Sequence, residues 1–472
     1  MKLKKAFLTS ILGLLCATTM ASCGGDSRIK IVVGMWPGTS AASDLAMFEV
    51  WKDRFEADYP EYRIEPESYT YSTTTANARG RSGNLPTVFQ TWFTEPPMLV
   101  NNKYIRDITP QLDALGWDDK MDEEMKKTLT FDNKIYGVPR DGYGLGLFLN
   151  LEILEFHGIV EDIDGDGKID LHDEEGNPLY PTTFDEIREV CEIIHEGSEG
   201  MQKGMLILSA NKNGGWQFSN MAWNFGATLQ VQGADGKWTG ALDSAESVAA
   251  MEWIRSLAAD DLLLNDTVLN YNDWYTKVSS SVAMAIVGSD VVSLAKTNGG
   301  MDLDKFAFVP MPAGPLGHRY SLFGGTPFVF ASNATDEQVV GALRFLEYMG
   351  RSPEISEVSI SAITEGHETA LRKGMPILPT IRPWINDDFL QKANQLDEKY
   401  IADSGVDMSY YQDFYDEIDD MKKTEEPHYP QEMYDLLDGV LQEVLEKPDT
   451  VNVQSSLTTA NATFNRQYMS KL

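Results

Sequence analysis

The sequence predicts an α/β protein with at least two domains. Short apolar runs typical of strands alternate along the chain with segments in which apolar residues recur every three to four positions, as on one face of a helix. The chain has 472 residues, of which 42% are hydrophobic, so it is long enough to bury two cores. Alternation of strands and helices favours largely parallel sheets with helices packed on their faces.

The boundaries of the expected elements come from these patterns and from helix caps. One helix carries Phe48, Trp51 and Phe55 on a single face, and two others begin with a capping box, at Thr183 and Thr335. In chain order we expect a strand at 29–33, a helix around 45–55, strands at 87–90, 145–149 and 205–208, a helix at 244–257, strands at 282–287 and 306–309, and helices from about residue 431.

The chain start has the pattern of an export signal. Lysines at positions 2, 4 and 5 precede an apolar run, residues 6–17, that is too short to span a bilayer permanently. The following Met-Ala-Ser-Cys, ending at Cys23, resembles a bacterial lipobox, although methionine stands where leucine is usual. We therefore expect residues 1–22 to be a signal peptide and residues 23–27 a tether acylated at Cys23. The mature protein would then be lipid-anchored at the extracellular face of the cell membrane, with simple secretion as the alternative.

Composition and motifs argue against several other classes of function. The formal net charge of −33 repels nucleic acid, so no nucleic-acid partner is expected. Cys191 lies on the apolar face of the helix that follows Thr183, which favours an inert buried thiol, and the three cysteines form no disulfide framework. The sequence lacks an HExxH zinc motif, a G-x-S-x-G elbow and a Walker loop, and the abundant carboxylates do not single out a catalytic pair.

An acidic stretch within residues 159–181 has the spacing of a calcium-binding loop. Counted from Asp162, acidic side chains occupy positions one, three, five, nine and twelve, glycine stands at six, and a backbone carbonyl is available at seven. The alternative is a solvated acidic loop, but crowded carboxylates repel one another without a cation. We expect a structural Ca²⁺ that orders this insertion. Its ligands would be Asp162, Asp164, Asp166, Asp170 and Asp173 through their side chains and Lys168 through its carbonyl.

A succession of weaker patterns covers nearly the whole mature chain. They include IKIVVGMWPG, NLPTVFQTW, NKIYGVPRDGYGLGLFLNLEIL, GADGKWTGALDSAESVAAMEWIRSL, VAMAIVGSDVV, FVPMPAGPLG and LFGGTPFVFASNATDEQVVGALRFLEYM. In order and spacing they resemble the extracellular solute-binding proteins of the carbohydrate class of ABC importers, the group that includes maltose-binding protein. The acidic insertion and the serines at 279–281, where the family often has glycine, depart from that pattern.

The resemblance implies a periplasmic-binding-protein-like fold of two α/β lobes with a ligand cleft and hinge crossings. Lobe 1 would comprise residues 28–145 and 323–425, and lobe 2 residues 146–322 and 426–472. The protein would be a monomer that captures a sugar or oligosaccharide, most simply a neutral one, and presents it to a membrane permease. It would need no catalytic residues.

Ligand-binding positions are carried over from the family pattern. Sugar rings offer C–H faces to aromatic side chains and hydroxyls to polar ones, so residues of both kinds are expected in the cleft, with Trp216 a less certain neighbour. Any one of the tryptophans could instead belong to a core. The expected ligand contacts are Trp36, Pro37, Trp92, Glu95, Arg140, Asp141, Tyr143, Trp223, Asn224, Ser289, Asp290, Gly324 and Gly325.

Three alternatives remain open on the sequence. A secreted calcium-dependent carbohydrate-active enzyme would cleave oligosaccharides rather than only bind them. A surface scaffold with a dockerin-like calcium module would be expected to carry paired loops, whereas one loop is present here. A solute-binding protein for a non-carbohydrate ligand would keep the same fold.

Overall fold

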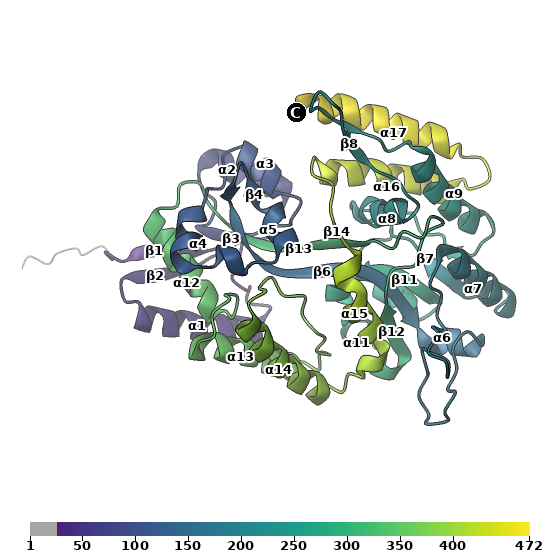
Figure 1. Ribbon diagram of the computed structural model, residues 1–472, viewed down its shortest axis with the longest axis horizontal. Coiled ribbons are helices and arrows are strands. Elements are labelled where there is room, and N and C mark those ends of the chain that lie inside the picture. Colours follow the sequence, from purple (N-terminus) through teal and green to yellow (C-terminus); the bar gives the residue numbers. More distant parts are fainter. Residues whose placement is uncertain (1–25) are drawn as a thin grey trace, which may run out of the picture.

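The computed structural model describes residues 26–472, which form two lobes joined by one continuous sheet (Figure 1). The expected signal peptide and Cys23 lie outside the described residues. The sheet has ten strands in the order β10-β7-β11-β6-β13-β3-β1-β2, with β12 added to β6 and β14 added to β13. The strands are β1 Ile29–Val33, β2 Tyr62–Pro66, β3 Val88–Gln90, β6 Gly137–Asn150, β7 Lys203–Leu206, β10 Leu263–Leu264, β11 Val282–Gly288, β12 Phe306–Val309, β13 Ser321–Phe330 and β14 Lys422–Thr424.

Two long strands, β6 and β13, run from one lobe into the other. The first half of β6 pairs with β13, and its second half pairs with β11 and β12. All of these pairings are antiparallel, so the expectation of largely parallel sheets is only partly correct: β1 with β2 and β3, β7 with β10 and β11, and β13 with β14 are parallel. The expected strand at 145–149 is the second half of β6, because glycines and charged residues interrupt the apolar pattern of the first half.

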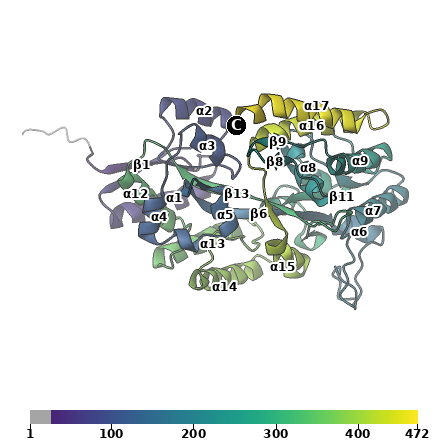
Figure 2. The same ribbon diagram turned by 45° about the horizontal axis from the view of Figure 1, so that its top comes forward.

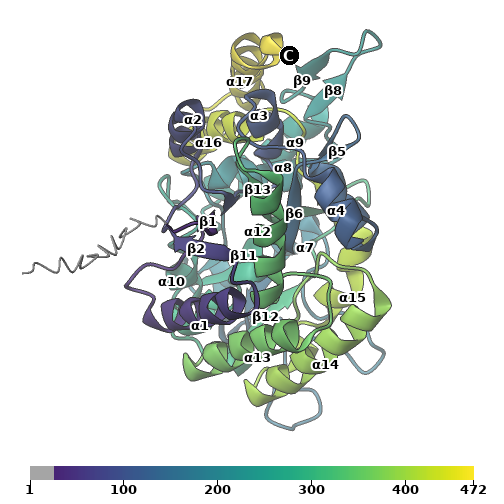
Figure 3. The same cartoon turned by 90° about the vertical axis from the view of Figure 1, so that its left-hand side faces the viewer.

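Lobe 1 has an apolar core on each face of its part of the sheet. Val88 of β3 packs with α1 and α12 on one face, whereas its neighbour Phe89 packs with α2 and α3 on the other, as the two-residue period of a strand requires. Figure 3 looks onto this end of the molecule, where α12, α1 and α13 lie together. The helices of this part are α1 Ala42–Asp58, α2 Thr73–Ser82, α3 Pro96–Asn101, α4 Thr109–Leu115, α5 Glu123–Thr128, α12 Asp336–Tyr348, α13 Glu357–Arg372 and α14 Asp387–Asp403; β4 Thr130–Phe131 and β5 Lys134–Ile135 form a small hairpin.

Lobe 2 has a single large core that includes the C-terminal helices. The capping box at Thr183 is present, since the Thr183 hydroxyl accepts from the Glu186 N–H and the Glu186 carboxylate accepts from the Thr183 N–H. The helices are α6 Leu151–Phe156, α7 Phe184–Gly197, α8 Asn213–Asn224, α9 Ala245–Ala259, α10 Trp274–Val278, α11 Leu294–Thr297, α15 Gln412–Met421, α16 Pro430–Glu446 and α17 Val453–Gln467; β8 Gln230–Gln232 and β9 Trp238–Gly240 form a separate hairpin. Figure 2 shows α16 and α17 above the sheet and the insertion at 159–181 projecting below α6.

The packing places the end of lobe 1 earlier than the expected boundary at residue 425. Residues from Tyr400 to Met421 contribute side chains to the core of lobe 2 rather than to that of lobe 1. The apolar face of α15 covers β12, where the rings of Phe414 and Phe308 lie 4.6 Å apart. The chain therefore leaves lobe 1 near the end of α14.

None of the helices within residues 26–472 combines the length and the apolar composition needed to cross a bilayer.

The close packing of α8 on α16 can be tested with two glycines. A Cβ placed on Gly215 of α8 would lie 2.2 Å from the carbonyl oxygen of Tyr434, whereas a Cβ on Gly439 of α16 would meet no atom within 4 Å. Gly215→Ala should destabilise the protein by about 1–3 kcal/mol through overpacking. Gly439→Ala should stabilise it by roughly 0.5–1 kcal/mol, because alanine is the better helix former. Urea unfolding of both variants measures the difference, and a Gly215→Ala variant as stable as the wild type would contradict this packing.

Candidate functional site

A cavity of about 320 Å³ lies between the lobes, beside the crossing strands. This volume is at the lower end of the range for small-molecule sites. It is bounded on one side by the loop after β3 and on the other by the start of α8, the loop before α10 and the start of α16. The lining residues are Trp92, Thr94, Tyr143, Asn211, Lys212, Asn213, Trp216, Tyr271, Asp290, Thr326, Glu425, Gln431 and Tyr434.

Aromatic side chains form much of the cavity wall. Tyr143 of β6 meets Trp216 of α8 edge to face with ring centroids 6.2 Å apart, and Trp216 meets Tyr271 in the same way at 5.4 Å. The Tyr271 hydroxyl accepts a hydrogen bond from the Gly288 N–H at 2.8 Å, which fixes its ring at the end of β11. From lobe 1, Trp92 is 43% exposed and leaves an indole face free for a ligand.

The start of α8 is held in place by a buried carboxylate from α16. Asp438 accepts hydrogen bonds from the N–H groups of Lys212 and Gly215 at 2.6 and 2.7 Å. Asn211 and Lys212 both have positive φ, 58° and 70°, so the chain turns sharply into the helix there. This turn presents Asn211 and Lys212 to the cavity and places Trp216 one turn further on.

Two carboxyl groups line the same cavity. Glu425 accepts a hydrogen bond from the Tyr434 hydroxyl at 3.0 Å, and burial by the surrounding walls raises the pKa of Glu425 to about 8. The Asp290 side chain is open to the cleft, but protein surrounds it on most sides. That reduced solvation, with the charge of Asp141 as a smaller contribution, raises the pKa of Asp290 to about 6.

A second cavity, of about 220 Å³, adjoins the first at Asp290. Asp141 and Ser289 line this second cavity, together with the loop at 376–381. Arg140 Nε lies 2.7 Å from the Asp141 carboxylate and an Arg351 nitrogen lies 3.9 Å from it, so its charge is balanced within the protein. A larger cavity of about 490 Å³ between α14 and α15 shares Thr380, Ile381 and Tyr415 with it.

The structure therefore divides the expected ligand residues into groups. Trp92, Tyr143 and Asp290 line the first cavity, as does Trp216, and Asp141, Ser289 and Asp290 line the second. Glu95 lies beneath the first cavity, where it is only 4% exposed and accepts a hydrogen bond from the Tyr71 hydroxyl. Burial raises the pKa of the Glu95 carboxyl. Arg140 acts on the site through its ion pair with Asp141.

Trp36 belongs to a core rather than to the cavity. Trp36 packs edge to face on Phe48 at 5.2 Å and stacks on Phe345 at 6.4 Å inside lobe 1, and its neighbour Pro37 lines neither interlobe cavity. Trp36 and Pro37 therefore do not face the cavity as expected, because α1 and α12 cover this junction between strand and loop.

Trp223 and Asn224 are structural as well. Trp223 is 1% exposed and donates from Nε1 to Glu426 at 3.0 Å. The Asn224 side chain accepts from the Tyr320 N–H and donates to the Tyr320 carbonyl, at 2.5 and 2.9 Å, which anchors the chain just before β13. Both residues lie about two turns beyond Trp216 along α8, and neither lines the cavity.

Gly324 and Gly325 have a role different from the one expected. A Cβ on Gly324 would lie 2.4 Å from the Tyr143 hydroxyl, and one on Gly325 would lie 2.4 Å from the Asp141 carbonyl oxygen and from the ring of Phe93. These glycines therefore allow β6 and β13 to approach and give Tyr143 its position. Neither lines the cavity.

Sequence reasoning missed nine of the thirteen residues that line the cavity. Tyr271, Glu425 and Tyr434 come from segments without a recognisable motif, and only the fold brings them to Tyr143. The Asn-Lys-Asn-Gly-Gly run at 211–215 was a usable signal, since it combines positive-φ residues with a helix start. The other residues missed are Thr94, Thr326 and Gln431.

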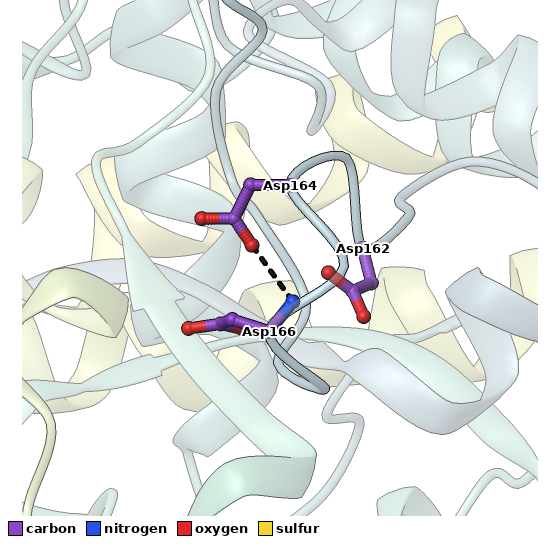
Figure 4. Close-up of side chains that lie close together, drawn as sticks. All are labelled: Asp162, Asp164 and Asp166. Carbon is purple, nitrogen blue, oxygen red and sulfur yellow. Dashed lines mark hydrogen bonds between the residues drawn. The ribbon is translucent and has the colours of Figure 1, made fainter.

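The acidic loop gathers three of its expected metal ligands (Figure 4). Oxygen atoms of Asp162, Asp164 and Asp166 lie within 4.8 Å of one another. The Asp162 carboxylate accepts from the N–H groups of Gly165 and Gly167, both of which have positive φ, and Asp164 accepts from the Asp166 N–H at 2.9 Å. Carboxylates at positions one, three and five on such a turn suit Ca²⁺.

The remaining expected ligands have other partners. Asp170 accepts from the Ile163 N–H within the loop at 2.8 Å. Asp173 instead caps a separate turn, accepting from the backbone and side-chain N–H groups of Asn177 at 2.7 and 2.9 Å. Lys168 was expected to bind through its backbone carbonyl, which its side chain leaves free, since the Lys168 ammonium points to Asp407 at 2.6 Å. Position twelve therefore lies apart from the three gathered carboxylates.

Comparison with known proteins agrees with this architecture. Residues 51–362 match the family described as bacterial extracellular solute-binding protein. An ABC transporter solute-binding protein from Thermotoga lettingae bound with α-D-tagatose has the same fold, with a TM-score of 0.67, 17% identity and coverage of 93% of this chain and 99% of that chain. UgpB from Mycobacterium tuberculosis in complex with glycerophosphocholine has a TM-score of 0.67, 15% identity and coverage of 94% of this chain and 98% of that chain. The cyclic α-maltosyl-1,6-maltose binding protein from Arthrobacter globiformis has a TM-score of 0.63, 18% identity and coverage of 93% of this chain and 98% of that chain. Among curated proteins, none matches the sequence.

These likenesses confirm the periplasmic-binding-protein-like α/β fold, and the family consists of binding proteins rather than enzymes. Because the family match covers more than half of the chain, the protein belongs to the bacterial extracellular solute-binding protein family.

Proposed function

We propose that the protein captures a sugar or oligosaccharide outside the cell and delivers it to the permease of an ABC importer. The observation that carries this proposal is the interlobe cavity, whose aromatic side chains and polar groups come from both lobes. Aromatic faces stack on the C–H faces of sugar rings, and carboxyl and amide groups pair with their hydroxyls. Tagatose and a cyclic maltosyl-maltose are the ligands named for two structural relatives, whereas glycerophosphocholine is named for a third.

The connections between the lobes fit a protein that closes on its ligand. Besides β6 and β13, the chain returns to lobe 2 near the end of α14. It then runs along β13 as β14, where Lys422 pairs with Asp122 of lobe 1 at 3.2 Å. Gln431 of α16 donates to the Thr94 hydroxyl at 3.3 Å across the cavity. A ligand that contacts Trp92 on one side and Trp216 on the other would favour the closed arrangement, because it binds both lobes at once.

We further infer that the acidic loop holds a structural Ca²⁺ through Asp162, Asp164 and Asp166, with affinity suited to extracellular calcium, roughly 10⁻⁴ M or tighter. When bound, the ion would neutralise the three crowded carboxylates. The loop lies on an insertion away from the interlobe cavity, so this calcium would stabilise the fold rather than contact the solute (Figure 2).

The ligand-binding proposal predicts a selective effect of Trp92. A calorimetric or thermal-shift screen of a glycan panel should first find a ligand at roughly micromolar affinity, equivalent to about 8 kcal/mol. Trp92→Ala should then weaken its binding about tenfold or more without unfolding the protein, because the indole is exposed and carries little of the core. Phe156→Ala is the matched control, since Phe156 is 76% exposed on α6, outside the interlobe cavities.

If wild type and Trp92→Ala bind the ligand with equal affinity, the first cavity is not the binding site. In that case Asp141→Ala, which alters the second cavity, should weaken binding instead. A panel on which no sugar binds but another solute does would overturn the carbohydrate assignment.

The calcium proposal predicts that chelation lowers the melting temperature of the wild type. At millimolar calcium the bound ion should contribute about 1 kcal/mol of stability, equivalent to a few degrees. Asp166→Ala should melt lower and be insensitive to the chelator, whereas Asp173→Ala should still respond if Asp173 stays on Asn177. Differential scanning fluorimetry with and without chelator measures the melting temperatures of the wild type and of both variants. Loss of solute binding in a calcium-free protein that remains folded would show that the metal has a functional role.

The anchoring proposal predicts a processed and acylated Cys23. Mass spectrometry of the N-terminal peptide from native cells should find Cys23 as the first residue with attached acyl chains, and Cys23→Ala should release the protein from the membrane fraction. An unmodified Cys23, or a mature terminus elsewhere, is the contrary result.

A further inference from the structure

We propose that the solute carries a positively charged amino group, which binds in the interlobe cavity against Glu425 and Asp290. This inference rests on the proposed function of that cavity and narrows the class of solute to an amino sugar, or an oligosaccharide that contains one. It replaces the expectation of a neutral sugar.

The first observation is the charge balance of the cavity. Asp290 and Glu425 are its acidic lining residues, and Lys212 is its single basic one. Within residues 26–472, no lysine, arginine or histidine nitrogen comes within 4.0 Å of either carboxylate, whereas Asp141 in the neighbouring cavity has both Arg140 and Arg351. In this part of the chain, neither Asp290 nor Glu425 therefore has a protein cation within ion-pairing distance.

The described residues around Glu425 supply no compensating charge, and near Asp290 the positive charge of Arg140 is outweighed by the negative charge of Asp141. Glu425 is faced by Tyr434, Tyr143 and Glu95, which are neutral or acidic. The positive charge of Lys212 acts on Glu95 below the cavity. Walls that exclude water disfavour ionisation of Glu425, and its pKa is raised accordingly. A ligand ammonium would reverse that cost, because an opposite charge nearby favours the ionised carboxylate.

The second observation is the aromatic lining. Tyr143, Trp216 and Tyr271 form a continuous edge-to-face series, with Trp92 and Tyr434 on the same cavity. Aromatic faces attract cations electrostatically, most strongly in partly desolvated sites. The same rings can stack on the C–H faces of a sugar. An amino sugar would use both properties of this wall.

The third observation is that the protein already houses an ammonium in a site of the same chemistry. Lys423 Nζ lies 4.5 Å from the ring centroid of Trp223 and 4.6 Å from that of Tyr320. The charge of Lys423 also acts on Glu426, which accepts from the Trp223 indole N–H. Lys423 fills that cage. Around Glu425, by contrast, the described residues place no lysine or arginine nitrogen within 4.0 Å of the carboxylate, although Lys212 lines the same cavity.

The test compares two oligosaccharides of the same length and linkage, one built of N-acetylglucosamine and the other of glucosamine. Isothermal titration at pH 6.5, where the amine is protonated, should show the glucosamine compound binding about tenfold or more tighter. Glu425→Gln and Asp290→Asn should each reduce that preference, and Glu196→Gln, an exposed control on α7, should not. Circular dichroism melts establish that each variant is folded. If Glu425→Gln does not fold, Asp290→Asn alone carries the test.

The possible outcomes separate this inference from the proposed function. Equal or weaker binding of the glucosamine compound, or binding of neutral glucose oligosaccharides alone, overturns the inference and leaves a sugar-binding protein. Binding of choline or putrescine, lost in Glu425→Gln, with no sugar bound, supports the cationic site and overturns the carbohydrate assignment. If no amine binds more tightly than its neutral counterpart, the inference is wrong.

Discussion

The pairing of β6 with β13 is the constraint on which the rest of the structure depends. These strands run antiparallel from Gly137 opposite Val329 to Gly144 opposite Phe323, and each then continues in the other lobe. Side chains of lobe 1 and lobe 2 press against this ribbon, so a Cβ on Gly142 would lie 2.5 Å from the Phe323 ring. Glycine is therefore required at the crossing for packing reasons, and the narrow ribbon leaves Tyr143 projecting beside the cavity.

The cavity wall is completed by elements that the crossing alone would not hold. α15 packs on β12 and leads directly into β14 and Glu425, so the position of Glu425 depends on how α15 is fixed. The insertion contributes to this, because Tyr180 donates to Asp413 at 2.6 Å and Lys168 pairs with Asp407 at 2.6 Å. The insertion thus supports the cavity indirectly, by holding α15, while the carboxylates of its acidic loop do not line the cavity.

The sequence predicted local structure well where the signal is local. The capping boxes at Thr183 and Thr335 and the strand at Ile29–Val33 are present, because hydrogen bonds between near neighbours and a short apolar alternation determine them. The predicted site was less complete because its decisive distinctions are not local. Trp36 and Trp92 each follow a strand, yet one is covered by α1 and α12 and the other is exposed. Which tryptophan faces solvent depends on helices far away in the chain.

The point at which the crossing strands are least constrained lies beside the cavity. The chain connects the lobes only through the crossing segments, so such motion must be absorbed there. The register of β6 and β13 shifts between Thr326 and Pro327, and proline has no N–H to donate to the ladder, which makes this point less constrained than its neighbours. Thr326 lines the first cavity, and its partner Asp141 lines the second. A solute in either cavity would therefore lie beside the bulge, so the proposed binding would act directly on the point at which the crossing can deform.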